Sequence, residues 1–333
     1  MDPSFIFDPE LPFDTKRERL FRFQSERNPV YRRFCDSLGF RADKPPEPGM
    51  EPLLPIRGFR DTALITEGES ADLLFHSSGT AGMRKSEHHV ADAEIYRRSV
   101  LEGFEQHYSA DSVLWAWLPG YRDNPFSSLI HMAEILINRD NSGLSHIFPP
   151  GDLPDKDDLE KLDRSGRSLV LFGAAFGLID LLEESTDPDQ PFGVPLPADT
   201  TIIETGGMKT HRREMSRMEL HSRLSEGFGV APGQIHSEYG MCELLSQAYA
   251  CGNPWFQPVP WMEVTIRDPE DSFRICTPGE EGKIGIVDLA NIYSCPFILT
   301  EDRGVADGEG RFQVLGRWRP DNLRGCNFLI DRD

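Results

Sequence analysis

Long apolar runs are missing from this sequence of 333 residues. No run approaches the length of about 18 apolar residues that a membrane-spanning helix needs. The first residues, MDPSFIFDPELPFD, have neither the basic start nor the apolar stretch of a secretion signal. Internal repeats and low-complexity tracts are missing too. We therefore expect a soluble, cytoplasmic protein that does not bind membranes.

Positive charge is also in short supply. The sequence has 35 Lys and Arg residues against 55 Asp and Glu residues, which gives a net charge of −20. Such a balance repels polyanions at long range, so it argues against nucleic acid as a partner. A local basic loop can still hold one small phosphate group.

Several motifs of common enzymes are absent. The six cysteines are scattered without a CxxC pair, which speaks against structural zinc and a redox dithiol. Without GxSxG the sequence does not fit an α/β hydrolase, and without HExxH it does not fit a zinc hydrolase. The adjacent pair His88 and His89 would point about 100° apart on a helix, so the two are not expected to bind one ion.

What is present is the pattern of an α/β protein. Helical spacing is predicted for residues 91–107 and 127–138, between short apolar runs that we interpret as strands. These runs are ADLLFHSS, SVLWAWLPG, RSLVLFG, TTIIETGG and QIHSEYGM. The alternation predicts mostly parallel sheets flanked by helices, with ligands beyond the carboxyl ends of the strands.

The pattern divides the chain into three parts. Residues 1–60 predict an N-terminal helical arm with one helix near Thr15 to Phe34, and residues 61–255 predict the α/β domain. Residues 256–333 predict a β-rich subdomain that completes the active site. Its strand-like runs are EVTIRD, FRICTPG, GKIGIVDLAN, PFILTED and RFQVLGRW.

The loop SSGTAGMRK at residues 77–85 follows a predicted strand and precedes a predicted helix, where backbone N–H groups converge on anions. Its glycines permit close approach of the main chain, and its hydroxyls and two cations suit a phosphate. It is not a Walker loop, because Arg84 stands where that motif requires glycine.

The loop is the first of four motifs that occur in order. The others are EYGMCE at 238–243, TED at 300–302 and LGR at 315–317. This series resembles the adenylate-forming superfamily of acyl-CoA synthetases and luciferases. The segments LPGY, SSLIHM, ETGG, EYGMCELLSQAY and LRGCN make the chain most similar to the acyl-protein synthetase (LuxE) family, from about Pro55 onward.

Two residues depart from the family pattern. Ala81 and Cys242 stand where the family usually has threonine. Each change removes a hydroxyl, and one hydrogen bond to a charged group contributes about 1.5–3 kcal/mol. We therefore expect activity to be weakened or redirected.

The resemblance implies that the protein joins a carboxylic acid to ATP, giving an acyl-adenylate and pyrophosphate. It implies that Glu243 holds Mg²⁺, a hard cation that prefers carboxylate oxygen. Asp302 would bind the ribose and Arg317 the ribose or the α-phosphate. The residues implied around the phosphates are Ser77, Ser78, Gly79, Thr80, Gly82 and Lys85, and those around adenine are Gly206, Gly207, Tyr239 and Gly240.

The second step implied by the resemblance passes the acyl group to a thiol. In the family a cysteine near the C-terminus accepts it and hands it to a partner such as an acyl reductase, and Cys326 occupies that position. Arg324 could favour its thiolate, and Cys242 is the competing candidate. Thiolates attack activated acyl carbons readily and leave readily again.

The sequence ends 16 residues after Arg317, so the large mobile C-terminal lid of bigger relatives is expected to be absent, along with its lysine. Lys85, Lys209 or a residue of a partner would then assist adenylation. Which of these serves stays open, as does the identity of the acid. Plausible walls of the acyl pocket are Trp115, Trp117, Tyr121 and Phe126.

Two alternatives remain from the sequence alone. One keeps adenylation but transfers the acyl group to coenzyme A, a carrier-protein thiol or an amine. The other is a degenerate nucleotide-binding subunit without chemistry, for which Ala81 and Cys242 argue. Lys85, Glu243, Asp302 and Arg317 together speak against this second alternative.

Overall fold

The computed structural model describes residues 1–77, 85–121, 124–149, 153–184, 196–206 and 215–318. Its helices are η1 Pro3–Phe7, α1 Phe13–Arg27, α2 Pro29–Ser37, α3 Gly58–Asp61, α4 Ala93–Glu105, α5 Ser128–Asn138, α6 Lys156–Ser165, α7 Ala175–Glu184, α8 Arg217–Phe228, η2 Pro232–Gln234 and η3 Leu289–Asn291. Within this part of the chain no helix has the length and apolar character needed to cross a membrane.

The strands form two large sheets and a hairpin. They are β1 Leu54–Pro55, β2 Leu73–His76, β3 Glu87–Val90, β4 Val113–Trp117, β5 His146–Phe148, β6 Leu169–Ala174, β7 Thr201–Thr205, β8 Ile235–Tyr239, β9 Ala248–Cys251, β10 Gln257–Pro258, β11 Met262–Arg267, β12 Gly282–Asp288, β13 Phe297–Ala306 and β14 Phe312–Arg317. Strands β2 and β3 make the antiparallel hairpin.

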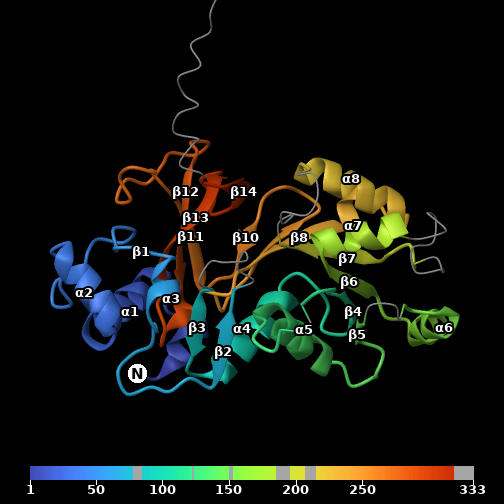
Figure 1. The fold of residues 1–333 in the computed structure, drawn as a ribbon, viewed down its shortest axis with the longest axis horizontal. Coiled ribbons are helices and arrows are strands. Elements are labelled where there is room, and N and C mark those ends of the chain that lie inside the picture. Colours follow the sequence, from blue (N-terminus) through green and yellow to red (C-terminus); the bar gives the residue numbers. More distant parts are fainter. Residues whose placement is uncertain (78–84, 122–123, 150–152, 185–195, 207–214, 319–333) are drawn as a thin grey trace, which may run out of the picture.

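The seven-stranded sheet has the order β10-β9-β8-β7-β6-β4-β5. Strands β5, β4, β6, β7 and β8 run parallel, and β9 and β10 run antiparallel to them. Helices α4 and α5 cover one face, and α7 and α8 cover the other (Figure 1). The predicted mostly parallel sheet flanked by helices is therefore confirmed.

Alternation along the strands explains why both faces are covered. In β4 the side chains of Val113 and Trp115 belong to the core under α7 and α8, whereas Leu114 and Ala116 belong to the core under α4 and α5. Because successive side chains of a strand point to opposite faces, a strand buried on both faces shows a continuous apolar run.

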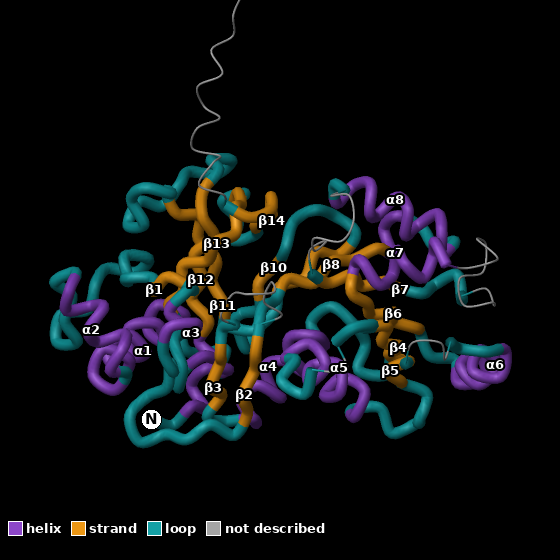
Figure 2. The backbone as a smooth tube through the Cα atoms, viewed as in Figure 1, coloured by secondary structure: helices purple, strands orange, loops and turns teal. Residues whose placement is uncertain are grey.

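The second sheet has the order β1-β13-β12-β11, with β14 paired to β13, and its strands pair antiparallel except for β1. It contains the β-rich region that the sequence predicts. Helices α1 and α2 pack against it, since the rings of Phe21 and Tyr31 lie 6.2 Å and 5.3 Å from that of Phe297. Figure 2 shows these helices beside the second sheet, away from the α4–α5 layer.

Two expectations about elements were wrong. The single helix near Thr15 to Phe34 is two helices, because Asn28 leaves the helical conformation and its side chain caps α2 by accepting from the N–H groups of Val30 and Tyr31. The run FRICTPG forms no strand, only an isolated bridge between Arg267 and Ile275, because its turn-forming residues curl it back.

Candidate active site

The carboxyl ends of the parallel strands carry several of the predicted site residues. Tyr239 ends β8 and Gly206 follows β7, whose last residue Thr205 pairs with Glu238. Gly206 has a φ of 78°, which favours glycine over other residues. Gly240 has no room for a side chain, because a Cβ there would clash with the carboxylate of Glu238.

A polar chain links this edge to the second sheet. The Tyr239 hydroxyl donates to Asp302 Oδ2 at 2.9 Å, and Arg317 Nε lies 3.7 Å from Asp302 Oδ1. Asp302 on β13 and Arg317 on β14 are direct partners in the strand register. The Tyr239 ring packs against Phe256 and Phe312, with centroids 5.8 Å and 5.4 Å away. The structure thus brings three of the predicted residues together.

Glu243 lies beside this chain and is buried, with 6% of its surface exposed. Burial raises the pKa of its carboxyl, the nearby Asp302 raises it further, and a hydrogen bond from Ser86 and the charge of Arg317 only partly oppose the rise. Burial likewise raises the pKa of Asp302 against the lowering effects of Arg317 and Tyr239. Both carboxyls therefore lie where additional positive charge would stabilise the ionised form.

The segment that carries Glu243 is held by buried polar side chains. Asn291 Nδ2 donates to the Glu243 carbonyl at 2.8 Å. Asp288 accepts the N–H groups of Leu245 and Ser246 on one oxygen, both at 3.0 Å, and the Ser246 hydroxyl on the other. These bonds fix a turn that regular secondary structure does not provide, so Glu243 is positioned before any ligand arrives.

His88 connects the same segment to the β2–β3 hairpin. Its Nδ1 lies 2.7 Å from the Cys242 carbonyl and its Nε2 lies 2.8 Å from the Ser294 hydroxyl. Burial lowers the pKa of His88 to about 4, so the ring is neutral. Since a carbonyl only accepts, Nδ1 carries the proton and Nε2 accepts from Ser294. His88 and His89 lie on strand β3 rather than on a helix, so they point to opposite faces.

The base of the Ser/Gly loop is closed by a pair of hydrogen bonds. Ser77 N–H donates to the Ser86 carbonyl at 3.0 Å, and Ser86 N–H donates to the Ser77 hydroxyl at 2.9 Å. The loop joins β2 to β3, so the expectation that it directly precedes a helix was wrong. Two short antiparallel strands with polar ends, including the run EHHV, replace the predicted strand-to-helix turn.

Part of the predicted site lies outside the described residues. This holds for Ser78, Gly79, Thr80, Ala81, Gly82, Arg84, Gly207, Lys209, Arg324 and Cys326. Lys85 is described and exposed at the end of the loop, next to the buried Ser86 that reaches Glu243. Its predicted role toward phosphate stays a prediction.

The predicted pocket walls divide into two groups. Trp115 and Trp117 are buried in the core under α7 and α8, and their indole N–H groups donate to the carbonyls of Leu144 and Gly177. They are therefore core residues. Tyr121 is half-buried, and its hydroxyl lies near Gly206 at the carboxyl edge of the sheet. Phe126 is 39% exposed and packs on His76.

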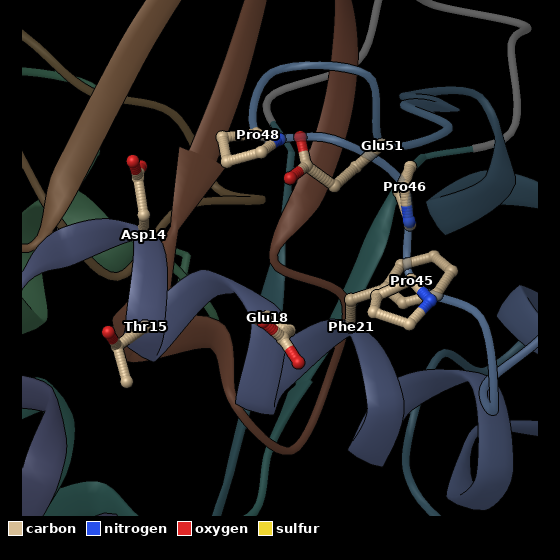
Figure 3. A pocket seen from close by; sticks show the side chains of 8 residues that line it. All are labelled: Asp14, Thr15, Glu18, Phe21, Pro45, Pro46, Pro48 and Glu51. Carbon is tan, nitrogen blue, oxygen red and sulfur yellow. The ribbon is translucent and has the colours of Figure 1, made fainter.

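A cavity of about 130 Å³ lies elsewhere, between α1 and the proline-rich segment of the N-terminal arm (Figure 3). It shares no residue with the four motifs, and we assign it no role in the chemistry. Its lining residues are Asp14, Thr15, Glu18, Phe21, Pro45, Pro46, Pro48 and Glu51.

No protein-family model and no curated protein matches the sequence, but solved structures match the fold. ATP-bound MatB from Rhodopseudomonas palustris matches with 21% identity and a TM-score of 0.51, over 74% of this chain and 48% of its own. An open conformation of 2-hydroxyisobutyryl-CoA ligase with 2-HIB-AMP and CoA matches with 14% identity and a TM-score of 0.62, over 92% of this chain and 69% of its own.

The chain has the fold of the adenylate-forming enzymes. It spans about half the length of MatB. The resemblance seen in the motifs is confirmed at the level of fold. At these identities the likeness carries no information on acceptor or substrate, so the closer similarity to acyl-protein synthetases stays a prediction.

The adenylate-forming fold places residues at the site that the motifs do not include. These are Ser86, His88, Asp288 and Asn291, and Thr205 and Glu238 lie there too, within quoted segments but without a predicted role. The signal available in the sequence was a polar residue at the end of a buried apolar run, as in KIGIVDLAN and TIIET. That signal predicts which residues lie at the edge of a sheet, but it does not predict which polar side chains contact one another there.

Proposed function

We propose that this protein activates a carboxylic acid with ATP, giving an acyl-adenylate and pyrophosphate. The observation that carries the proposal is the linked set of Tyr239, Asp302 and Arg317 beside the buried Glu243. The segment after β8 meets the paired strands β13 and β14 there, about 60 residues further along the chain, in the fold shared with an ATP-bound enzyme and with a ligase that holds an acyl-adenylate.

In the first step a carboxylate oxygen of the acid attacks the α-phosphorus of ATP. The phosphorus–oxygen bond to the β-phosphate breaks and pyrophosphate leaves, so no proton has to move. Such a step depends on positioning and on positive charge rather than on an acid–base pair. Arg317, whose side chain is 73% exposed and already oriented by Asp302, is available for the α-phosphate, and Lys85 for the leaving phosphates.

The described residues fit a magnesium ion as the companion of ATP. Mg²⁺ takes one or two carboxylates from a protein and the rest of its ligands from phosphates and water. Glu243 would hold the ion, since it is a buried carboxyl whose pKa is raised by burial and by the neighbouring Asp302. When bound, the ion neutralises charge on the phosphates.

We further propose that the acyl group passes to a thiol of the protein itself and then to a partner protein such as a reductase. The thiolate sulfur attacks the acyl carbon, the bond from that carbon to AMP breaks, and the thiol proton goes to solvent. Cys326 is our candidate from the sequence. Cys242 is disfavoured, because burial and the adjacent Glu243 raise its pKa well above the ordinary value.

Intact-protein mass spectrometry tests both steps. The wild type, Cys326→Ser and Cys242→Ser are incubated with ATP, Mg²⁺ and a mixture of carboxylic acids. We expect an added acyl mass on the wild type and on Cys242→Ser but not on Cys326→Ser. Acylation of Cys326→Ser would contradict the assignment of the nucleophile.

The alternatives give different outcomes in the same experiment. Release of AMP and pyrophosphate without an added mass means that the acceptor is external, such as coenzyme A, a carrier protein or an amine. No consumption of ATP with any acid supports the degenerate nucleotide-binding subunit. Against the latter stands the set of Tyr239, Asp302 and Arg317 beside the buried Glu243.

A further inference from the structure

Glu238 is a buried carboxyl at the carboxyl edge of the seven-stranded sheet that the chemistry above does not use. It lies on β8, is 6% exposed, and its Oε2 accepts a hydrogen bond from the Thr205 hydroxyl of β7. Both side chains lie on the face covered by α4 and α5, since Glu238 and Thr205 are direct partners in parallel strands.

The charge of Glu238 is not balanced within the described part of the chain. No Lys, Arg or His of that part forms an ion pair with it, and the neighbouring charge is another carboxylate, Glu204. Burial raises the pKa of Glu238 to about 7, the Thr205 hydroxyl opposes this, and Glu204 adds to it. Burying a carboxyl in this way destabilises a protein unless a partner is supplied.

A purely structural role does not account for the residue. Strands β7 and β8 are already joined by their backbone ladder from Ile202 to Thr205, so the side-chain bond adds no necessary link. Asp288 shows what a structural carboxylate looks like in this protein, with four donors that fix a turn. Glu238 has one donor from a described residue, the hydroxyl of Thr205.

The surroundings of Glu238 suit a small organic ligand. Burial raises the pKa of Tyr121, and the charge of the Glu238 carboxyl adds to that rise. Tyr121 is half-buried and its hydroxyl lies near Gly206. Gly206 and Gly240 have no side chains, so none is added beside the carboxyl at these two positions. Both glycines lie at the edge of the sheet where ligands of open parallel sheets bind.

We propose that Glu238 selects the acid that this protein activates, by accepting a hydrogen bond from a hydroxyl or ammonium group on the acid's carbon skeleton. The substrate class is therefore a hydroxy or amino carboxylic acid rather than an unsubstituted fatty acid. This inference rests on the proposed adenylation. A donor group on the ligand would then supply the charged or second hydrogen-bonding partner that no described residue provides for the Glu238 carboxyl.

ATP–pyrophosphate exchange with matched acids tests it. The panel pairs unsubstituted acids from butanoate to octanoate with their terminal hydroxy and amino counterparts. We expect the wild type to have a kcat/KM about 10- to 100-fold higher for a hydroxy or amino acid than for the unsubstituted acid of the same length. Glu238→Leu should abolish that ratio while retaining exchange with the unsubstituted acid.

Two further variants control for shape and charge. Glu238→Gln preserves the size and an acceptor for Thr205, so it should fold, keep part of the preference for the hydroxy acid and lose the preference for the amino acid. Glu204→Gln removes the buried carboxylate on the opposite face of β7, whose charge opposes the ionisation of Glu238, so the variant should retain the preference for the substituted acids. Thermal melting of each variant verifies that it is folded.

The outcomes separate the two proposals. Equal activity of the wild type on substituted and unsubstituted acids, with ratios that do not move in Glu238→Gln and Glu238→Leu, overturns the inference and leaves adenylation standing. Absence of exchange with every acid overturns adenylation, and the inference with it.

Discussion

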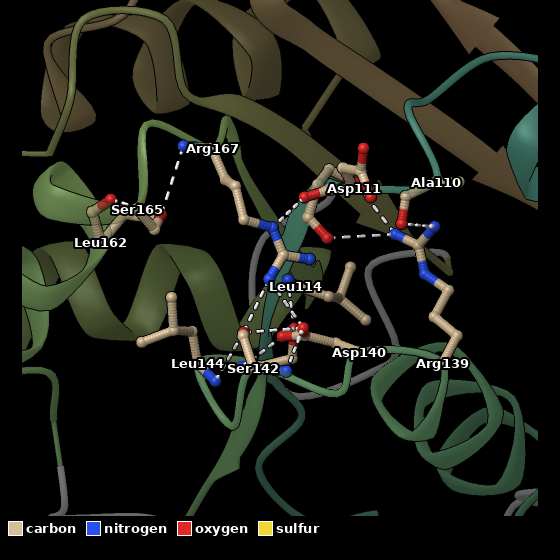
Figure 4. A network of polar contacts seen from close by, with 12 residues as sticks. Ala110, Asp111, Leu114, Arg139, Asp140, Ser142, Leu144, Leu162, Ser165 and Arg167 are labelled. Carbon is tan, nitrogen blue, oxygen red and sulfur yellow. Dashed lines mark hydrogen bonds and ion pairs between the residues drawn. The ribbon is translucent and has the colours of Figure 1, made fainter.

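The two ends of the seven-stranded sheet both bury carboxylates, but in opposite surroundings. At the amino ends of β4 and β6 lies Asp140, whose side chain is 2% exposed (Figure 4). It accepts from the N–H and hydroxyl groups of Ser142 and Ser145 and from Arg167 at 2.7 Å. Burial would raise the pKa of Asp140, but these bonds hold it well below its usual range.

The carboxyl ends show the reverse. Glu238 and Glu243 are also buried, and Asp302 of the adjoining second sheet has a side chain that is 17% exposed, yet desolvation outweighs their few donors and the pKa of each is raised. Within the described residues, the protein therefore completes the hydrogen bonding of Asp140 and supplies too little positive charge to offset the burial of the other three carboxylates. A buried carboxylate whose charge is fully compensated by donors stabilises a fold. A buried carboxylate whose charge is only partly compensated is suited to binding a ligand that carries positive charge or a donor group.

The largest effect is expected at Glu243. Replacing it by Gln keeps its shape and removes the charge that would hold Mg²⁺, so we expect kcat for ATP–pyrophosphate exchange to fall by about 100- to 1000-fold. Because the pKa is raised in the folded state, the ionised group destabilises the fold at neutral pH, and the variant should melt at the same temperature or higher. A large loss of stability with unchanged kcat would make Glu243 a structural carboxylate like Asp140.

Asp140→Asn should show the opposite profile. The variant loses the negative charge of Asp140, which accepts hydrogen bonds from one guanidinium and four other donors. We therefore expect the free energy of unfolding, measured by urea titration, to fall by about 2–4 kcal/mol. The lowered pKa of Asp140 contributes stability at pH values above the ordinary pKa of 3.8, and this contribution is lost as pH falls below 3.8 toward the pKa of the folded state. The difference in the free energy of unfolding between wild type and Asp140→Asn should therefore become smaller below pH 3.8. Exchange activity per folded molecule should not change, and a change would contradict the separation of the two ends.

The linear motifs explain why much of the carboxyl end was predictable. Tyr239, Glu243, Asp302 and Arg317 lie in short patterns with fixed internal spacing, and the apolar runs around them predict the strands that position them. The mostly parallel sheet followed from alternation alone. These features are local, so one sequence is enough to find them.

The remaining features depend on contacts between distant segments. The Asp140 network joins residues 27 positions apart, and His88 reaches Cys242 over 154 positions. The strand β3 was missed because EHHV is short and polar, and only its pairing with β2 makes it a strand. No pattern within a single segment predicts that Asp288 binds the backbone of Leu245 and Ser246, or that the side chains of Glu238 and Thr205 form a hydrogen bond.

A smaller effect is expected from pH at Glu238. Its pKa rises from 4.5 to about 7 on folding, so its protonation contributes stability that is complete below pH 4.5 and is lost as pH rises through 7. Glu238→Gln mimics the neutral form at every pH. In urea titrations the variant should match wild type below pH 4.5 and exceed it by roughly 1–3 kcal/mol above pH 7. An equal difference at both pH values would show that Glu238 does not titrate as described.

The smallest effect is expected from Tyr239→Phe, which keeps the packing on Phe256 and Phe312 but removes the donor to Asp302. Asp302 then loses one of the groups that oppose the rise in its pKa, so the acid limb of kcat/KM for ATP should move to higher pH, with a loss of about 3- to 10-fold at neutral pH. The matched control is Tyr108→Phe, which removes a buried hydroxyl bonded to His236 at the far end of β8. It should lower stability by about 1 kcal/mol and leave the pH profile in place. If both variants shift the profile equally, the Tyr239–Asp302 bond does not tune the site, and the two ends of the sheet differ less than their carboxylates suggest.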